Sequence, residues 1–91
     1  MNPFSMEGRV AVVTGGATGI GLAIGRALAE AGARVTLSSR SKEKGETAAS
    51  ALRNEGLSVQ FAACDVSSPG EVAGLVEGVV AEHGRLNAMV M

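Results

Sequence analysis

The chain has few of the side chains that several common classes of site require. Its 91 residues include one cysteine, Cys64, and one histidine, His83, which excludes an internal disulfide and a metal site built from a cysteine or histidine cluster. Tryptophan and tyrosine are absent, aromatic residues make up 2% of the sequence, and eight basic residues oppose nine acidic ones. Since no basic stripe and few base-stacking rings are present, we expect no nucleic-acid partner.

Long apolar runs are also missing. Residues 1–9 contain no apolar segment of the kind that a secretory signal peptide carries, and no later run approaches the length of a membrane span. We therefore expect no membrane partner. A cytoplasmic location is the default for such a chain with one unpaired cysteine.

Strand-like and helix-like segments alternate along the sequence, in which 46% of residues are apolar. Ser68, Pro69 and Glu71 form an N-cap, first-turn proline and capping-box pattern, and Gly32, Gly56 and Gly84 stand where helices should end. The predicted strands are residues 9–13, 34–38, 57–63 and 86–91, and the predicted helices are residues 19–31, 41–55 and 68–83.

This alternation with short connections is typical of an α/β fold with parallel strands and right-handed crossovers. It predicts the N-terminal half of a Rossmann-type doubly wound sheet with strand order 3-2-1-4. The first two helices should cover one face and the third helix the other. A ligand crevice is expected at the carboxyl ends of the strands, beside the first one.

The stretch TGGATGIG, residues 14–21, places four glycines directly after the first predicted strand. A phosphate needs backbone N–H groups with no side chain in the way, and a helix N-terminus adds its positive dipole end. Gly15 would turn the chain, Gly19 would let backbone approach a pyrophosphate, and Gly21 would let the helix lie close to the sheet. A glycine turn alone is equally compatible with a simple tight connection, but the strand–helix context favours a dinucleotide.

The pattern Thr14-Gly15-x-x-x-Gly19-Ile20-Gly21 resembles the cofactor loop of the classical short-chain dehydrogenase/reductase family. Thr18 argues against the extended branch of that family, whose glycine spacing is one residue shorter. Two further stretches, residues 64–66 (CDV) and 84–90 (GRLNAMV), resemble the family's Asp-Val pair and its lead into the fourth strand. Asn87 stands where the family usually has aspartate. The resemblance covers nearly the whole chain but only the N-terminal part of the family.

The resemblance implies a set of cofactor-binding residues. Asp65 would accept a hydrogen bond from the adenine amino group, and the backbone of Val66 would frame the ring. Ser39 stands where NAD-preferring members have aspartate, and Arg40 stands where NADP-preferring members often have arginine, so NADP(H) should be preferred and NAD(H) remain possible. The complete set is Gly15, Thr18, Gly19, Ile20, Gly21, Ser39, Arg40, Asp65 and Val66.

The resemblance also limits what these residues can do. The family's catalytic tyrosine has no counterpart, since the chain has no tyrosine, and Lys42 and Lys44 are its only lysines. We expect residues 1–91 to be one NAD(P)-binding domain, incomplete at its C-terminal end and inactive alone. The complete protein would be a homo-oligomeric oxidoreductase that transfers hydride between NADP(H) and a small carbonyl or alcohol substrate. The alternative is a non-catalytic nucleotide-binding or interaction module.

Overall fold

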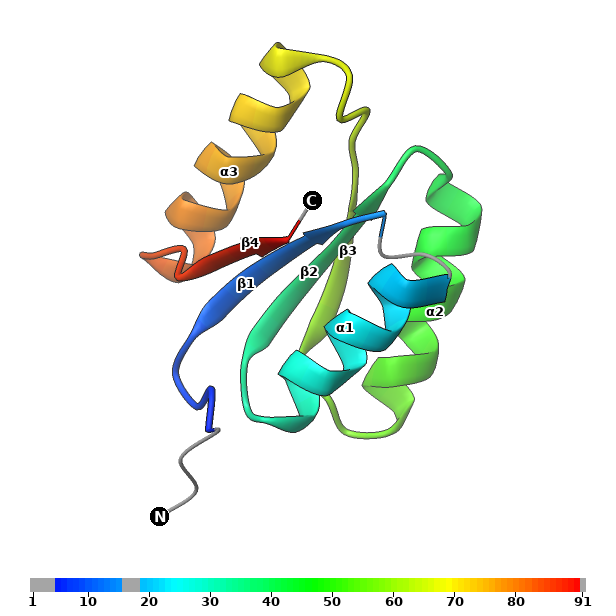
Figure 1. The fold of residues 1–91 in the computed structure, drawn as a ribbon, viewed down its shortest axis with the longest axis vertical. Helices are drawn as coiled ribbons and strands as arrows, with labels where there is room; N and C mark the ends of the chain where they lie inside the picture. The colour runs from blue at the N-terminus through cyan, green and yellow to red at the C-terminus, as the bar shows by residue number, and fades with distance from the viewer. Residues whose placement is uncertain (1–4, 16–18, 91) are drawn as a thin grey trace.

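The computed structural model describes residues 5–15 and 19–90, which form a parallel sheet with helices on both faces (Figure 1). The elements follow the predicted alternation, and the strands lie in the order β3-β2-β1-β4, as expected. Their bounds are β1 Val10–Thr14, α1 Gly19–Glu30, β2 Arg34–Ser39, α2 Lys42–Asn54, β3 Val59–Ala63, α3 Pro69–His83 and β4 Ala88–Val90.

Two apolar clusters form the core, one on each face of the sheet. Val13, Val35 and Leu37 face α1 and α2, where they pack with Ala29, Ala49 and Leu52. Val10 and Val12 of β1 face α3, where they pack with Leu75 and Val79. Since alternate residues of β1 enter different clusters, this strand is buried on both faces, which explains why it is a continuous apolar run.

Side-chain caps begin the second and third helices. The Ser41 hydroxyl accepts a hydrogen bond from the Lys44 amide and the Ser68 hydroxyl accepts one from the Glu71 amide, both at 3.4 Å. The capping-box prediction is correct for Ser68 and wrong for its reciprocal half. Glu71 Oε1 accepts a hydrogen bond from the Asp65 backbone N–H, at 3.1 Å, instead of the one from Ser68.

Strand ends differ from the prediction by one or two residues, for local reasons. The third strand begins at Val59 instead of residue 57, because the Leu57 amide bonds to the Leu52 carbonyl and closes the end of α2. The fourth begins at Ala88, since the Asn87 side chain already accepts the Val10 N–H at 2.9 Å. Met91 lies outside the described residues.

Close helix–sheet approach depends on two glycines that the sequence analysis did not single out. A Cβ at Gly25 of α1 would lie 2.6 Å from Leu37 Cδ2, and a Cβ at Gly45 of α2 would overlap the ring of Phe61. Both glycines are buried. They allow α1 and α2 to lie close to β2 and β3.

Candidate functional site

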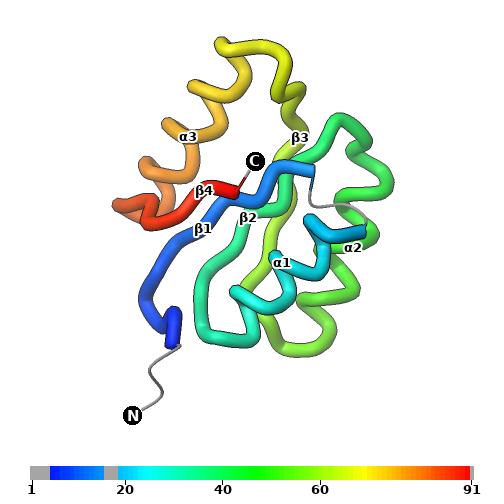
Figure 2. Tube along the Cα trace, in the orientation of Figure 1, coloured from blue at the N-terminus to red at the C-terminus, as the bar shows by residue number. Residues whose placement is uncertain are grey.

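Each of the first three strands is followed by a helix, so three strand-to-helix connections lie at the carboxyl ends of the parallel strands. α1 follows β1 in the chain, the turn after β2 leads into α2, and the segment after β3 leads into α3 (Figure 2). The first two helices run back on one side of the sheet and α3 on the other, so the connections separate beside β1. A crevice at this reversal of strand order is the common ligand position in such sheets.

The turn after β1 has the backbone that its glycines permit. Gly15 and Gly19 have φ values of 69° and 62°, in the left-handed region that side chains disfavour, and a Cβ at either would meet nothing within 4 Å. Ile20 is 80% exposed at the first turn of α1, and Gly21 is half-buried. Thr18, the remaining predicted residue here, lies outside the described residues.

The first turn of α1 differs from those of the other two helices. It contains no acidic residue, whereas Glu43 lies in the first turn of α2 and Glu71 in that of α3. A helix N-terminus carries a positive partial charge that an anion stabilises. The open backbone and this uncompensated end fit a phosphate group, which is the part of a dinucleotide that the glycine turn is predicted to hold.

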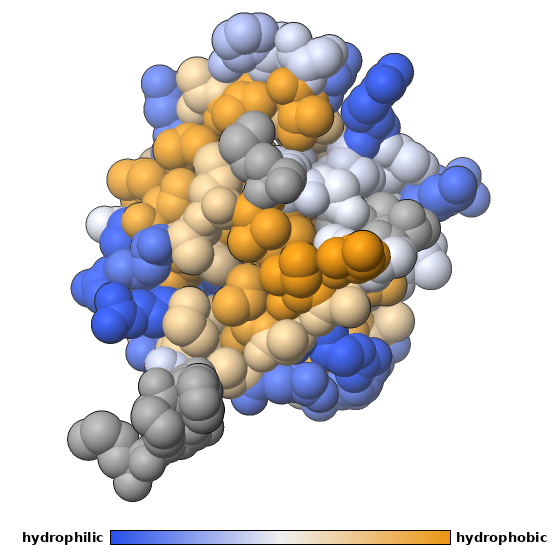
Figure 3. All heavy atoms as spheres, viewed as in Figure 1, coloured by the Kyte–Doolittle hydropathy of each residue, from blue (hydrophilic) through white to orange (hydrophobic). Residues whose placement is uncertain are grey.

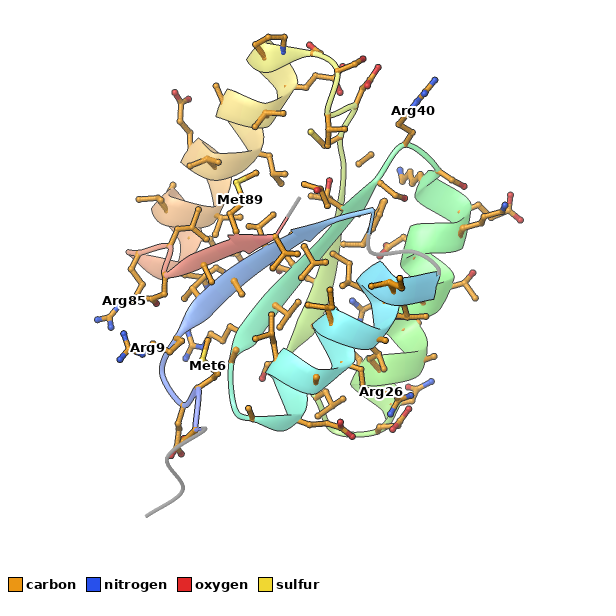
Figure 4. All side chains as sticks on the ribbon, viewed as in Figure 1. Met6, Arg9, Arg26, Arg40, Arg85 and Met89 are labelled. Carbon is orange, nitrogen blue, oxygen red and sulfur yellow. The ribbon has the colours of Figure 1, made fainter. Side chains whose placement is uncertain are left out.

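Ser39 is the last residue of β2 and Arg40 follows it, at the same end of the sheet. Arg40 is exposed and projects away from the fold (Figure 4), and its positive charge makes a small contribution to lowering the pKa of Asp65. Ser39 is half-buried, and its hydroxyl donates a hydrogen bond to the Ser41 carbonyl at 3.1 Å. The guanidinium of Arg40 is therefore the accessible donor of this pair.

Asp65 is held in a defined orientation after β3. Its Oδ1 accepts hydrogen bonds from the Ser67 hydroxyl at 2.7 Å and the Ser67 amide at 2.9 Å, while its own amide donates to Glu71. These two bonds from Ser67, with a smaller contribution from the positive charge of Arg40, hold the pKa of the Asp65 carboxyl below its ordinary value. Asp65 is thus an ionised acceptor at neutral pH, and Val66 beside it is 48% exposed.

Two residues that position Asp65 were missed by the sequence analysis. Ser67 fixes the carboxylate, and Glu71 fixes the backbone of the same residue. The spacing Asp-x-Ser is a recognisable sequence pattern, because an aspartate side chain often accepts the N–H two residues later. No comparable pattern reveals Glu71, since its expected partner was the Ser68 amide.

Ser38, the next-to-last residue of β2, has a buried hydroxyl with no partner among the described residues. The residue is completely buried, and its Oγ has no hydrogen-bond partner within the described part of the chain. Thr14, the neighbour in register on β1, instead donates its hydroxyl to the Val90 carbonyl at 3.0 Å. An unsatisfied buried hydroxyl destabilises a fold, so this edge of the sheet is not optimised for stability alone.

Residues 5–15 and 19–90 contain neither a cluster of metal-binding side chains nor a helix that could span a membrane. Among these residues no three histidine, cysteine, aspartate or glutamate side chains are grouped closely enough to hold a metal ion. No helix in the same ranges combines the length and apolar character needed to traverse a bilayer. Cys64, at 2% exposure, packs with the cluster under α3 as a small apolar side chain.

Known proteins resemble this chain over most of its length. The family model for short chain dehydrogenases matches residues 9–91. The putative ketoacyl reductase 1 of the granaticin polyketide synthase of Streptomyces violaceoruber is 41% identical over 81 residues, which cover 89% of this chain and 30% of that protein. Dehydrogenase/reductase SDR family member 4 of Sus scrofa is 41% identical over 85 residues, which cover 93% and 30%.

The solved structures give the same result for the fold. The crystal structure of gox2181 superposes with a TM-score of 0.92 at 40% identity, covering 94% of this chain and 34% of that chain. A citronellol catabolism dehydrogenase of Pseudomonas aeruginosa superposes with a TM-score of 0.90 at 36% identity, covering 98% and 37%. The chain therefore spans about a third of the length of the proteins that it matches.

Proposed function

Because the chain belongs to the short-chain dehydrogenase family, we propose that it is the NADP(H)-binding part of an enzyme that transfers hydride between NADP(H) and a carbonyl or alcohol substrate. The observation that carries the choice of cofactor is Arg40, an exposed guanidinium at the end of β2, with serines and no carboxylate before and after it. An acidic residue at this place would bind the ribose hydroxyls of NAD and repel a 2′-phosphate.

Different residues at this end of the sheet would bind different parts of the dinucleotide. The turn with Gly15 and Gly19 and the first turn of α1 would hold the pyrophosphate, with Thr18, Ile20 and Gly21 in the same stretch. Arg40 would bind the 2′-phosphate through two charge-assisted hydrogen bonds. When bound, the dinucleotide supplies or accepts the hydride at its nicotinamide ring.

The adenine end rests on Asp65 and Val66. Oδ1 of Asp65 is already occupied by Ser67, whereas no described residue donates a hydrogen bond to its Oδ2, which can accept one from the adenine amino group. Ser39 is a secondary phosphate ligand, because its hydroxyl must leave the Ser41 carbonyl before it can donate to a phosphate. Arg40 therefore carries most of the preference.

The test compares NADPH and NADH binding in the complete protein. Hydrogen bonds to charged groups contribute roughly 1.5 to 3 kcal/mol, so Arg40→Ala should weaken NADPH binding about 10- to 150-fold and leave NADH binding nearly unchanged. Arg9→Ala is the matched control, since Arg9 is equally exposed but lies before β1, at the other end of the sheet. Isothermal titration calorimetry at low ionic strength gives both affinities.

The reciprocal variant strengthens this test. Ser39→Asp combined with Arg40→Ile should reverse the preference, because it supplies a carboxylate for the ribose hydroxyls and removes the phosphate ligand. Equal affinity of the unaltered protein for NADH and NADPH would disprove the assignment of Arg40. An equal loss of both cofactors in Arg40→Ala would mean that the residue acts on the fold.

We assign no catalytic residue to residues 1–91. The chain has no tyrosine to act as the family's proton donor, and general acid–base assistance is typically worth about 10² to 10⁴-fold in rate. The isolated chain should oxidise NADPH no faster than buffer in the presence of a simple ketone. The complete protein would be cytoplasmic and homo-oligomeric.

The second candidate is a non-catalytic nucleotide-binding or interaction module. Such a module would use the same half-fold and the same glycine turn without a catalytic tyrosine. The coding sequence beyond Met91 separates the two candidates. Asn-Ala-Gly followed by a serine and Tyr-x-x-x-Lys would favour the enzyme, and a stop codon would favour the module or a truncated remnant.

A further inference from the structure

Basic side chains gather at the end of the sheet opposite the glycine turn. The starts of β2, β1 and β4 lie side by side there, because Val10 pairs with Arg34 and the Asn87 amide donates to the Val10 carbonyl. Arg34 begins β2, and Arg85 lies in the short connection before β4. Figure 4 shows Arg85 projecting outward at this end, far along the sheet from Arg40.

A hollow of about 260 Å³ lies among these side chains. It is lined by Arg34, His83, Arg85, Gly8 and Val10, so two guanidinium groups and an imidazole share one recess. Arg34 and His83 also line an adjoining hollow of about 220 Å³. Residues of β2, of α3 and of the connection before β4 thus contribute basic side chains to one concave surface.

The two arginines of the hollow have no carboxylate partner within residues 5–15 and 19–90. The ion pairs of this part of the chain use Arg26, Arg53 and His83. His83 is 4.0 Å from Glu82, and its Nε2 is 3.2 Å from the Gln60 amide nitrogen. Arg34 and Arg85 therefore keep their donors available to a ligand.

Compensation of helix dipoles explains only part of this arrangement. His83 lies in the last turn of α3, where a basic side chain stabilises the helix. Arg85 lies beyond the Gly84 cap, and Arg34 lies in β2, so neither belongs to the last turn of a helix. The dipole effect falls off within that turn, so it does not account for the two arginines.

We propose that Arg34, His83 and Arg85 line a second anion site, at the amino ends of the strands, which binds a small multivalent oxyanion. Arginine is suited to this task because its planar fork donates two parallel hydrogen bonds to phosphate or carboxylate oxygens. The concave shape favours a small ligand over a flat protein surface. Asn87 contributes by being neutral, since it caps the Val10 amide without adding a negative charge.

Pyrophosphate is the probe for this site. It is titrated into the complete protein at constant ionic strength, once with the dinucleotide site saturated by NADP⁺ and once with it saturated by NAD⁺. We expect a dissociation constant of about 0.1 to 1 mM for pyrophosphate, because the arginine side chains of the hollow are exposed and their charges are partly screened by salt. Saturation with dinucleotide keeps pyrophosphate from the glycine turn. The test therefore does not depend on which cofactor the protein prefers.

Three variants separate the site from general charge. Arg34→Gln and Arg85→Gln should each weaken pyrophosphate binding about tenfold, and Arg9→Gln, which removes the same charge outside the hollow, less than about twofold. Asn87→Asp keeps the hydrogen bond to Val10 and adds a carboxylate, so it should weaken binding about threefold without unfolding the strand pair.

Several outcomes would overturn the proposal. They are no binding up to about 10 mM pyrophosphate, loss of binding when dinucleotide is added, or equal weakening by Arg9→Gln and Arg85→Gln. Binding of a glutamate-rich peptide through Arg34 and Arg85, with none of pyrophosphate, would instead make this surface a docking site for an acidic protein.

Discussion

Replacing Gly45 of α2 should destabilise the protein, even when the new residue is alanine. It is the fourth residue of the helix and is buried against β3, where an added Cβ would overlap Cε1, Cδ1 and Cζ of Phe61. Phe61 is half-buried and packs against the cluster shared by α1 and α2. The ring must therefore move, or α2 must move away from the sheet.

The magnitude follows from two opposed effects. Glycine to alanine in a helix interior stabilises by roughly 0.5 to 1 kcal/mol, because alanine loses less backbone entropy on folding. Adding a methyl group to a packed core costs roughly 1 to 3 kcal/mol. We expect the second effect to win, since the overlap involves three ring atoms, and Gly45→Ala to lower the free energy of unfolding by about 1 kcal/mol.

Urea unfolding of the complete protein measures this effect against a matched control. Gly78→Ala is the control, because Gly78 also lies in a helix interior but a Cβ there would meet nothing within 4 Å. It should stabilise the protein by roughly 0.5 to 1 kcal/mol. NADPH affinity should fall in Gly45→Ala and not in Gly78→Ala, because α2 begins two residues after Arg40.

Phe61→Leu supplies the decisive double-mutant cycle. Leucine lacks the Cε1 and Cζ atoms that the Cβ would meet, and its remaining Cδ1 can rotate away about χ2, so Gly45→Ala should be neutral or stabilising in the Phe61→Leu background. A destabilisation of the same size in both backgrounds would refute the reasoning. A more stable Gly45→Ala protein with unaltered NADPH affinity would refute it as well.

Three further predictions concern the cofactor edge. Gly19→Val should lower dinucleotide affinity at least about 100-fold in calorimetry, because a β-branched residue resists a φ of 62° and would occupy the space of the pyrophosphate. The control is Gly56→Val, at a φ of 89° and with equal room for a Cβ, which should leave dinucleotide affinity unchanged. Ser38→Ala should raise the free energy of unfolding by about 1 kcal/mol in urea, since it removes a buried hydroxyl that has no partner among residues 5–15 and 19–90; a loss of stability would show that the hydroxyl has a partner. Ser67→Ala should raise the pKa of Asp65 toward its ordinary value in an NMR titration. The stabilisation from Asp65 is present at neutral pH and is lost as pH falls through its lowered pKa. The unaltered protein and Ser67→Ala should therefore become equally stable in acid. A difference in the free energy of unfolding that stays constant with pH would contradict this cause.

The isolated chain should also associate with itself. Hydrophobic residues gather between α1 and α3, around the edge strand β4 (Figure 3), and Met89 points toward α3 there (Figure 4). An open strand edge with apolar neighbours pairs readily with another chain. Monomers at high micromolar concentration in analytical ultracentrifugation would contradict this expectation.

The sequence was sufficient to predict the element order, the strand order and the faces that the helices cover. These features depend on short-range patterns: the continuous apolar run of β1, the Ser68-Pro69 start of α3 and the glycine after each helix. Strand ends were less predictable, because they depend on partners distant in sequence. Asn87 sets the start of β4, because its side chain accepts a hydrogen bond from the amide of Val10, which lies 77 residues earlier.

Close packing and site geometry were the features that the sequence could not supply. Gly25 and Gly45 resemble the exposed Gly74 and Gly78 in sequence, and only the positions of Leu37 and Phe61 distinguish them. The same limit applies to Glu71. Its capping-box position predicts a bond to the Ser68 amide, and only the path of the chain after β3 brings the Asp65 amide closer.

The electrostatic coupling between Arg40 and Asp65 determines whether the cofactor preference can be changed without losing the adenine contact. Of the causes that lower the pKa of Asp65, the two hydrogen bonds from Ser67 are larger and the charge of Arg40 is smaller. Removing Arg40 therefore leaves the carboxylate oriented by Ser67 and ionised at neutral pH. The proposed phosphate contact of Arg40 and the proposed adenine contact of Asp65 are thus separable, which is why Arg40→Ala should lower NADPH affinity while NADH binding persists.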